Sequence, residues 1–185
     1  MIAQTLTSLG GIEEFTDKES AIWASSFDKD FIEGPGRLPE SSLCRLVGME
    51  TPNYQVTGWA NDGQQLVTNQ GEDLGLTLHH TPGHTPDQLA IWDPQERFLF
   101  VGDSIYEWAA ILFPLEGNVT TYSKTIGKMK KLVQGWNQES GKEPGSFEVF
   151  YIDGSYRHHW QRCACVASEN VMRPQHPERG CPRVA

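Results

Sequence analysis

The residues best suited to metal chemistry lie in the stretch "LHHTPGHTPDQLAIWDPQERFLFVGDSIY", which runs from Leu78 to Tyr106. His84 follows a Pro-Gly pair after one strand-like run, and Asp103 follows the apolar run "FLFVG". Side chains at strand ends converge on one edge of a sheet, where a pocket can form. Neutral imidazole and carboxylate are common ligands of zinc, iron and manganese. The pair therefore predicts a metal site made of His84 and Asp103.

Each residue has a plainer interpretation when it is taken alone. A histidine on a loop is more often a surface or capping residue than a ligand. An aspartate after glycine is more often a turn residue or a helix N-cap. The same reasoning predicts turn or capping roles for Asp87 and Asp153. Of His79 and His80, one is expected to be packed and the other to face solvent.

Two other kinds of chemistry are not supported by the residue spacing. Ser104 has no G-x-S-x-G setting, which argues against a serine hydrolase. Cys163, Cys165 and Cys181, with His176, invite comparison with a zinc knuckle. Their C-x-C spacing departs from the usual C-x₂₋₄-C, and no paired histidines complete such a site.

Composition narrows the class of protein. The chain has 185 residues and a formal net charge of −9, which disfavours nucleic acid or an anionic membrane as a partner. No run is long and apolar enough for a membrane span, and the N-terminus does not resemble a secretory signal. Three of the four cysteines fall in the last 23 residues, so a disulfide framework is not expected. We expect a cytoplasmic protein that handles small molecules or other proteins.

The elements that must position His84 and Asp103 are short strands and one amphipathic helix. Alternating apolar residues between turn signals predict the strands within 54–80, and apolar runs predict the others, two of which form a hairpin on either side of the turn at residues 94–96. Apolar residues at helical spacing, with lysines opposite, predict the helix. The expected strands are 21–25, several within 54–80, 88–93, 97–103 and 147–153; the expected helical segments are 12–15, 26–33 and 120–136, and 34–42 is expected to be a loop.

The stretch "HTPGHTPDQLAIWDPQERFLFVGDSIYEW" resembles the metallo-β-lactamase fold superfamily, whose members carry a "TPGHT" loop and then a hairpin ending in "GD". The following "ILFPLEGNV" looks like the thioesterase-type or uncharacterised eukaryotic and fungal members. The resemblance implies an α/β fold (α+β in some schemes), a four-layer αββα sandwich. It also implies that His84 binds a first metal ion and that Asp103 bridges two, with zinc (Zn²⁺) as the expected cofactor.

The rest of the family's ligand set is missing from the matching positions. In the family, an H-x-H-x-D-H loop leads into a helix that begins "GGI", and here "AQTLTSLGGIEEF" stands at that junction. The four ligand positions fall on Ala3, Thr5, Thr7 and Ser8, none of which is a strong zinc ligand at neutral pH. The sequence therefore predicts a degenerate active site.

The family's last ligand is usually a histidine in a "GH" pair after a late strand. Here Gly154-Ser155 stands at that point, and His158 and His159 follow. A rearranged loop could present one of these two histidines to the metal.

The resemblance also predicts the organisation of the chain. Residues 1–153 are expected to form a partial metallo-β-lactamase-like domain, apparently truncated at its N-terminus, and 154–185 an irregular C-terminal tail. The expected function is metal-dependent hydrolysis of a small-molecule ester or thioester. The alternative is a catalytically dead relative or fragment that serves as a binding or structural module. An exposed sheet edge would favour self-association.

Overall fold

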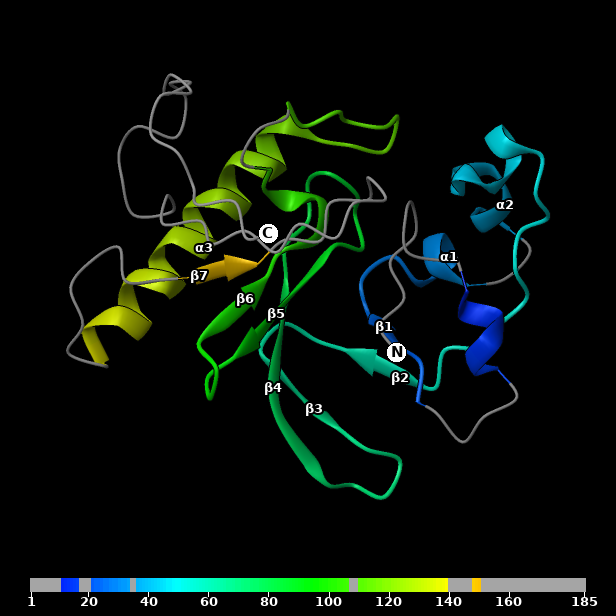
Figure 1. Cartoon of the computed structure of the whole chain (residues 1–185). Helices are drawn as coiled ribbons and strands as arrows, with labels where there is room; N and C mark the ends of the chain where they lie inside the picture. Colours follow the sequence, from blue (N-terminus) through cyan, green and yellow to red (C-terminus); the bar gives the residue numbers. More distant parts are fainter. Residues whose placement is uncertain (1–10, 17–20, 34–35, 107–109, 140–147, 151–185) are drawn as a thin grey trace, which may run out of the picture.

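Two β-sheets with helices on their outer sides make up the fold in a computed structural model of the chain (Figure 1). The structure describes residues 11–16, 21–33, 36–106, 110–139 and 148–150. The elements are η1 (Ile12–Phe15), β1 (Trp23–Ser25), α1 (Lys29–Ile32), α2 (Leu38–Ser41), η2 (Leu43–Val47), β2 (Gly58–Ala60), β3 (Gln64–Val67), β4 (Asp73–His80), β5 (Leu89–Asp93), β6 (Phe98–Phe100), η3 (Gly102–Ser104), α3 (Val119–Glu139) and β7 (Glu148–Phe150), where η marks a 3-10 helix.

The larger sheet has the strand order β3-β4-β5-β6-β7. Strands β3 to β6 are antiparallel to their neighbours, and β7 runs parallel to β6. The β5–β6 pair is the hairpin that the sequence predicted, and β7 lies within the predicted late strand. The smaller sheet is the parallel pair β1–β2. A parallel pair needs a crossover connection, which α1, α2 and η2 supply here.

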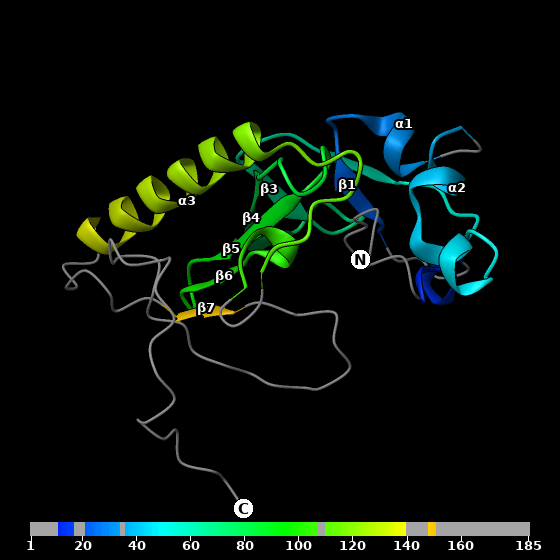
Figure 2. The same cartoon turned by 90° about the horizontal axis from the view of Figure 1, so that it is seen from above.

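Helix α3 covers one face of the larger sheet (Figure 2). Its buried Met129 and Val133 lie four residues apart on one side of the helix, as an amphipathic helix requires. They pack against a set of sheet residues that includes Trp92 and Leu99. Trp136 stacks on Trp92 with ring centroids 4.1 Å apart. The amphipathic helix predicted for residues 120–136 is therefore confirmed, and it extends to Glu139.

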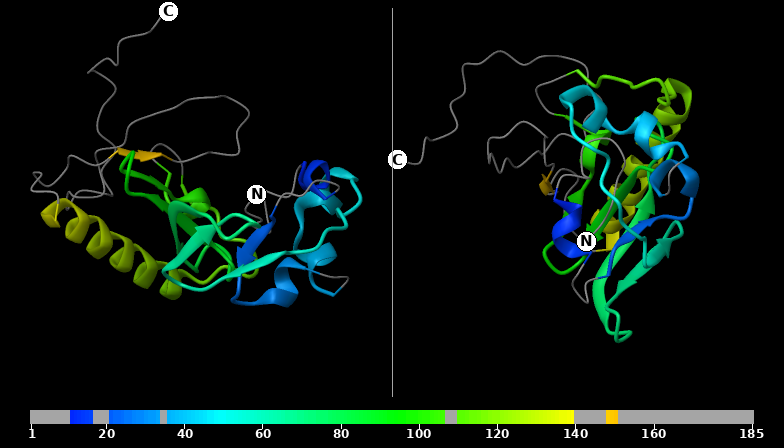
Figure 3. Two further views of the ribbon diagram at one scale, coloured as in Figure 1. Left: turned by 90° about the horizontal axis from the view of Figure 1, so that it is seen from below. Right: turned by 90° about the vertical axis from the view of Figure 1, so that its right-hand side faces the viewer.

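The opposite face of the larger sheet meets the smaller sheet. Leu78 and Leu89 cluster there with Ala60 of β2, and Trp23 of β1 packs against them. A separate cluster joins β1 to η1, α1 and α2, which gather at the end of the molecule away from α3 (Figure 3). The order of layers is thus helix, sheet, sheet, helices. This arrangement confirms the predicted α/β class and the four-layer sandwich.

Helix α2 corrects the prediction that residues 34–42 form a loop. Pro39 lies in the first turn of this helix, where a backbone N–H has no partner within the helix and its absence costs nothing. Ser41 donates its hydroxyl to the carbonyl of Arg37 at 2.8 Å. The loop-like composition of residues 34–42 therefore gave no indication of this one helical turn.

Phe27 corrects a second prediction. The sequence placed Phe27 on one side of a helical turn with Phe31 and Ile32, and these two are buried. Phe27 itself is half exposed and stacks flat on the His80 ring at 3.8 Å. It precedes α1, so helical spacing did not apply to it.

The predicted boundary between residues 153 and 154 lies outside the described residues, and the division into a domain and a tail stays a prediction. Within the described ranges, no helix is long and apolar enough to cross a membrane.

The contact between α3 and the sheet is expected to carry much of the stability. Met129→Ala should lower the free energy of unfolding by roughly 2–5 kcal/mol, because a buried side chain is removed and a cavity remains. Gln134→Ala, on the exposed side of the same helix, should change it by less than about 0.5 kcal/mol. Urea unfolding of both variants checks this, and equal losses would show that α3 is not packed as described.

Candidate metal site

The loop between β4 and β5 places His84. Its ends are held together where Thr81 N donates to the Gln88 carbonyl at 2.8 Å, one step beyond the last paired residues of the two strands. Gly83 N donates to the Thr85 carbonyl at 3.0 Å, which curls the loop around His84. The histidine is 8% exposed. The sequence "TPGHT" thus forms a tight loop that holds one imidazole nearly buried.

Gly83 is required at its position for two reasons. Its φ of +140° lies in a region that favours glycine. A Cβ added there would also lie 2.4 Å from the backbone Cα of Tyr122 in α3. The loop that carries His84 is therefore in direct backbone contact with the first turn of α3.

Asp103 lies in η3, directly after β6 and the residue Val101. The sequence predicted it at the end of a strand, and the structure instead gives it a 3-10 turn that directs its side chain toward His84. The His84 Nε2 and Asp103 Oδ2 atoms are 3.8 Å apart. Two donors at tetrahedral angles around one zinc, each about 2.1 Å from it, would be roughly 3.5 Å apart. The structure therefore brings the two predicted residues together, while metal binding by them stays a prediction.

Aromatic residues surround this pair. The Tyr106 hydroxyl donates a hydrogen bond to the Asp103 carboxylate. Phe113 lies with its ring 6.4 Å from the His84 ring and 5.2 Å from that of Tyr122. The Tyr122 hydroxyl donates to the Ser104 carbonyl at 2.8 Å, and burial raises the pKa of this phenol, which keeps it protonated as a donor.

The donor set fits a metal ion in chemical type but not in number. His84 and Asp103 supply an imidazole and a carboxylate that face each other. Within the described part of the chain, the buried Nδ1 of His84 has no hydrogen-bond partner, whereas metal-binding histidines usually donate this second N–H. No group of three or more His, Cys, Asp or Glu side chains forms a metal site among the described residues. An open catalytic zinc needs about three protein ligands.

Several predicted residues lie outside the described ranges. These are the four substituted ligand positions (Ala3, Thr5, Thr7, Ser8), the two histidines considered as a last ligand (His158, His159), Asp153, and the C-terminal cysteines with His176. Asp87 is described, and it lies in a turn as predicted, with its carboxylate fully buried.

His79 and His80 form a second polar cluster with Asp62 and Lys128, away from the His84–Asp103 pair. Lys128 Nζ donates to Asp62 Oδ1 at 2.5 Å and to the His80 carbonyl at 2.8 Å. His79 is 9% exposed, and His80 is part-buried under Phe27. His79 is thus packed as predicted, whereas His80 does not face solvent freely, because the Phe27 ring covers its own ring.

The sequence reasoning missed Tyr106, Phe113 and Asn118. Asn118 had a readable signal, since it lies two residues before the predicted helix 120–136; it directly precedes α3 and caps it by accepting from Thr121 N at 2.9 Å. Tyr106 and Phe113 had none, because they lie in segments without a period of two or 3.6.

Replacement of Gly83 by alanine should disturb the loop that holds His84. Gly83→Ala is expected to lower the free energy of unfolding by at least about 2 kcal/mol, because strained backbone and a clash with α3 add together. Gly71→Ala is the matched control, since its φ is +83° but no atom lies within 4 Å of the added Cβ. Thermal or urea unfolding compares the two variants, and a loss no greater than that of the control would contradict the contact with Tyr122.

Stability should also depend on pH through the second cluster. Burial lowers the pKa of His79 and of His80 below the usual 6.5, so the unfolded chain binds protons that the folded chain does not. The free energy of unfolding should be highest at a pH above the pKa that these histidines have in the unfolded chain, and it should fall from roughly pH 7 to pH 5. His79→Gln should make this fall shallower while leaving the curve above about pH 7.5 flat. An unchanged slope in urea unfolding at stepped pH would show that His79 is not buried in its neutral form.

Comparison with known proteins agrees with this architecture. A family model described as the metallo-beta-lactamase superfamily matches residues 3–136. The avaE protein of Aspergillus versicolor, named as a candidate transcription factor, is 32% identical over 128 residues, which cover 68% of this chain and 38% of avaE. The acyl-coenzyme A thioesterase MBLAC2 of Bos taurus is 27% identical over 139 residues, which cover 75% of this chain and 46% of that protein. The chain thus spans less than half the length of these curated relatives.

The crystal structure of TTHA1623 in a di-iron-bound form superposes with a TM-score of 0.55 at 17% identity, covering 80% of this chain and 63% of the other. That likeness concerns the fold. Together with the family match over residues 3–136, it shows that this chain belongs to the metallo-beta-lactamase superfamily.

Proposed function

We propose that this protein is a metal-dependent hydrolase of an ester or thioester, in which His84 and Asp103 bind the metal ion. The observation that carries the proposal is the 3.8 Å approach of His84 Nε2 to Asp103 Oδ2 beside the loop that joins η3 to α3. Both side chains are almost fully buried, and a buried imidazole beside a buried carboxylate is a usual arrangement for a zinc, iron or manganese site.

The name of one of the two relatives, MBLAC2, supports a thioester as the substrate. MBLAC2 carries the name of an acyl-coenzyme A thioesterase and matches 75% of this chain. A bound zinc ion would lower the pKa of water to about 7 and so supply hydroxide at neutral pH. The protein's own groups would hold the site in place: Tyr106 fixes the Asp103 carboxylate through its hydrogen bond, and Phe113 shields the His84 ring.

A third metal donor is needed for catalysis, and it must come from outside the described residues. His158 and His159 are the candidates that the sequence offers.

Metal titration tests the proposal directly. The full chain, freed of metal with a chelator, is expected to bind zinc ions, and His84→Ala and Asp103→Asn should each weaken binding at least tenfold, because loss of even an outer partner of a metal site typically costs about 10–100-fold. Asp73→Asn, an exposed carboxylate at the far end of β4, is the control and should leave binding unchanged. Calorimetry gives the affinities, and a thioester hydrolysis assay with acyl-coenzyme A follows activity in the same variants.

The second candidate is a relative without hydrolytic activity that uses the same fold for binding. It is favoured by the shortage of donors, since the described residues supply only two in this site. Folded wild-type protein that binds no zinc, or that binds it equally well without His84, would contradict the first proposal and support this one.

A further inference from the structure

A run of apolar residues lies exposed on the loop between η3 and α3. Leu112 is 80% exposed and Leu115 is 95% exposed, and Val119, the first residue of α3, is 63% exposed. Ile111, Phe113 and Pro114 complete five consecutive apolar residues. Only Leu112 and Leu115 of these five are exposed, and the other three are part-buried between or beside them. Large apolar side chains that protrude this far next to a candidate site can mark a contact site.

Hydrogen bonds hold this loop in a defined conformation. Gly117 N donates to the Pro114 carbonyl at 2.9 Å and closes a turn. Asn118 N donates to the Gly83 carbonyl at 2.7 Å, and its side chain caps α3. The end of the loop is therefore tied to the residue next to His84 and to the start of the helix, which places the backbone around Leu115 near the candidate site.

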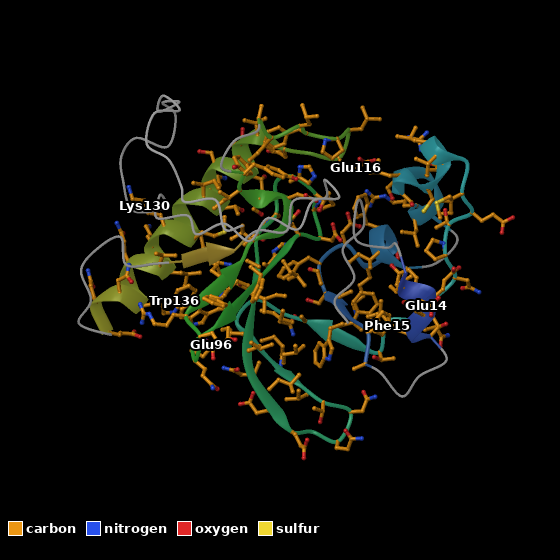
Figure 4. The ribbon with its side chains drawn as sticks, in the orientation of Figure 1. Glu14, Phe15, Glu96, Glu116, Lys130 and Trp136 are labelled. Atoms are coloured by element: carbon orange, nitrogen blue, oxygen red, sulfur yellow. The ribbon has the colours of Figure 1, made fainter. Side chains whose placement is uncertain are left out.

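The apolar run is continuous with the candidate metal site. Phe113 lies in this loop, and its ring lies beside the ring of His84. From α3 the loop extends toward the α1–α2 segment (Figures 1 and 2). Figure 4 labels Glu116 in the loop and Trp136 in the last turns of α3, so the run lies far along the helix from the Trp92–Trp136 stack. The exposed leucines thus extend outward from the His84–Asp103 pair.

We propose that Leu112, Phe113 and Leu115 form the surface that binds the apolar acyl chain of the substrate, whose carbonyl lies at the His84–Asp103 pair. This inference rests on the proposed function and adds the substrate class, an ester or thioester with an alkyl chain of several carbons. Ligand sites are typically lined by apolar side chains with a few polar groups that fix the orientation. Here the loop supplies the apolar side chains, and the His84–Asp103 pair supplies one imidazole and one carboxylate beside Phe113.

A second copy of the chain and a membrane surface fit the exposed leucines of the loop less well than an alkyl chain does. Two leucines and a valine are too few for a stable interface with a second copy of the chain, which needs about 800 Å² from each partner. The net charge of −9, with Glu116 in the loop itself, opposes contact with an anionic membrane. An alkyl chain requires neither a large area nor a positive surface.

Alkyl ligands that cannot be hydrolysed test the inference without any reaction. The probes are the thioethers S-ethyl-coenzyme A and S-octyl-coenzyme A, titrated by calorimetry into the full chain in the presence of a chelator. Each fully buried methylene strengthens binding about fourfold, so the octyl compound should bind at least tenfold more tightly even on a partly exposed surface. The double variant Leu112→Ser/Leu115→Ser should remove most of this difference and leave the affinity for the ethyl compound unchanged.

Leu74→Ser is the matched control. Leu74 is 50% exposed near the start of β4, at the opposite end of that strand from the His84 loop, and its replacement should affect neither probe. Equal affinity for the two probes, or an equal loss in the control, would overturn the inference. It would also be overturned if the double variant changed only self-association in sedimentation or only binding to phosphatidylcholine vesicles. If the protein prefers the octyl compound but binds no zinc, only the proposed function is refuted. If it hydrolyses thioesters with zinc but does not distinguish the two probes, only this inference is refuted.

Discussion

The contact between the His84 loop and the first turns of α3 determines the geometry of the candidate site. Gly83 lies directly against the backbone of Tyr122, its carbonyl accepts from Asn118 N, and the Pro82 carbonyl accepts from the Thr125 hydroxyl at 2.5 Å. These contacts join segments about forty residues apart in the chain. The loop cannot move without the helix, and the helix is held by its buried face against the sheet. Burial of Met129 and Val133, far from the site, therefore helps to fix the position of the His84 imidazole.

Much of the fold was predictable because the spacing of apolar residues along the sequence distinguishes strands from helices. Apolar runs on either side of the turn at residues 94–96 predicted the β5–β6 hairpin, a last apolar run predicted the strand that became β7, and spacing near 3.6 predicted α3. Helix α2 was missed because its four residues are too short to show a period, and Pro39 argued for a loop. The parallel pairing of β1 with β2 was not predicted either, since it joins residues 35 apart and leaves no local pattern.

The site was predictable to the extent that strand pairing defines it. His80 pairs with Leu89, and Ile91 pairs with Phe100, so the loop after β4 and the turn after β6 come to the same edge of the sheet. The sequence shows these pairings through the hairpin, and the meeting of His84 with Asp103 follows. Tyr106 and Phe113 reach the same place from irregular segments, whose course depends on contacts between distant residues. Such contacts leave no pattern in the local sequence.

The stability of the sandwich and the chemistry of the site depend on different residues. The three apolar clusters of the described chain contain neither His84 nor Asp103, and each is centred on strands and helices rather than on the loops of the site. In small zinc domains the metal supplies the folding energy, so that loss of a ligand unfolds the chain. Here the core is apolar, so we expect the layers to stay intact when His84 or Asp103 is replaced. Membership of the superfamily therefore does not establish hydrolysis. The proposed acyl-binding residues of the loop beside His84 are not metal donors. Under that proposal, a protein that has lost the donors for catalysis would keep its affinity for an apolar ligand, so the two candidate functions would share one binding surface and differ in the number of metal ligands.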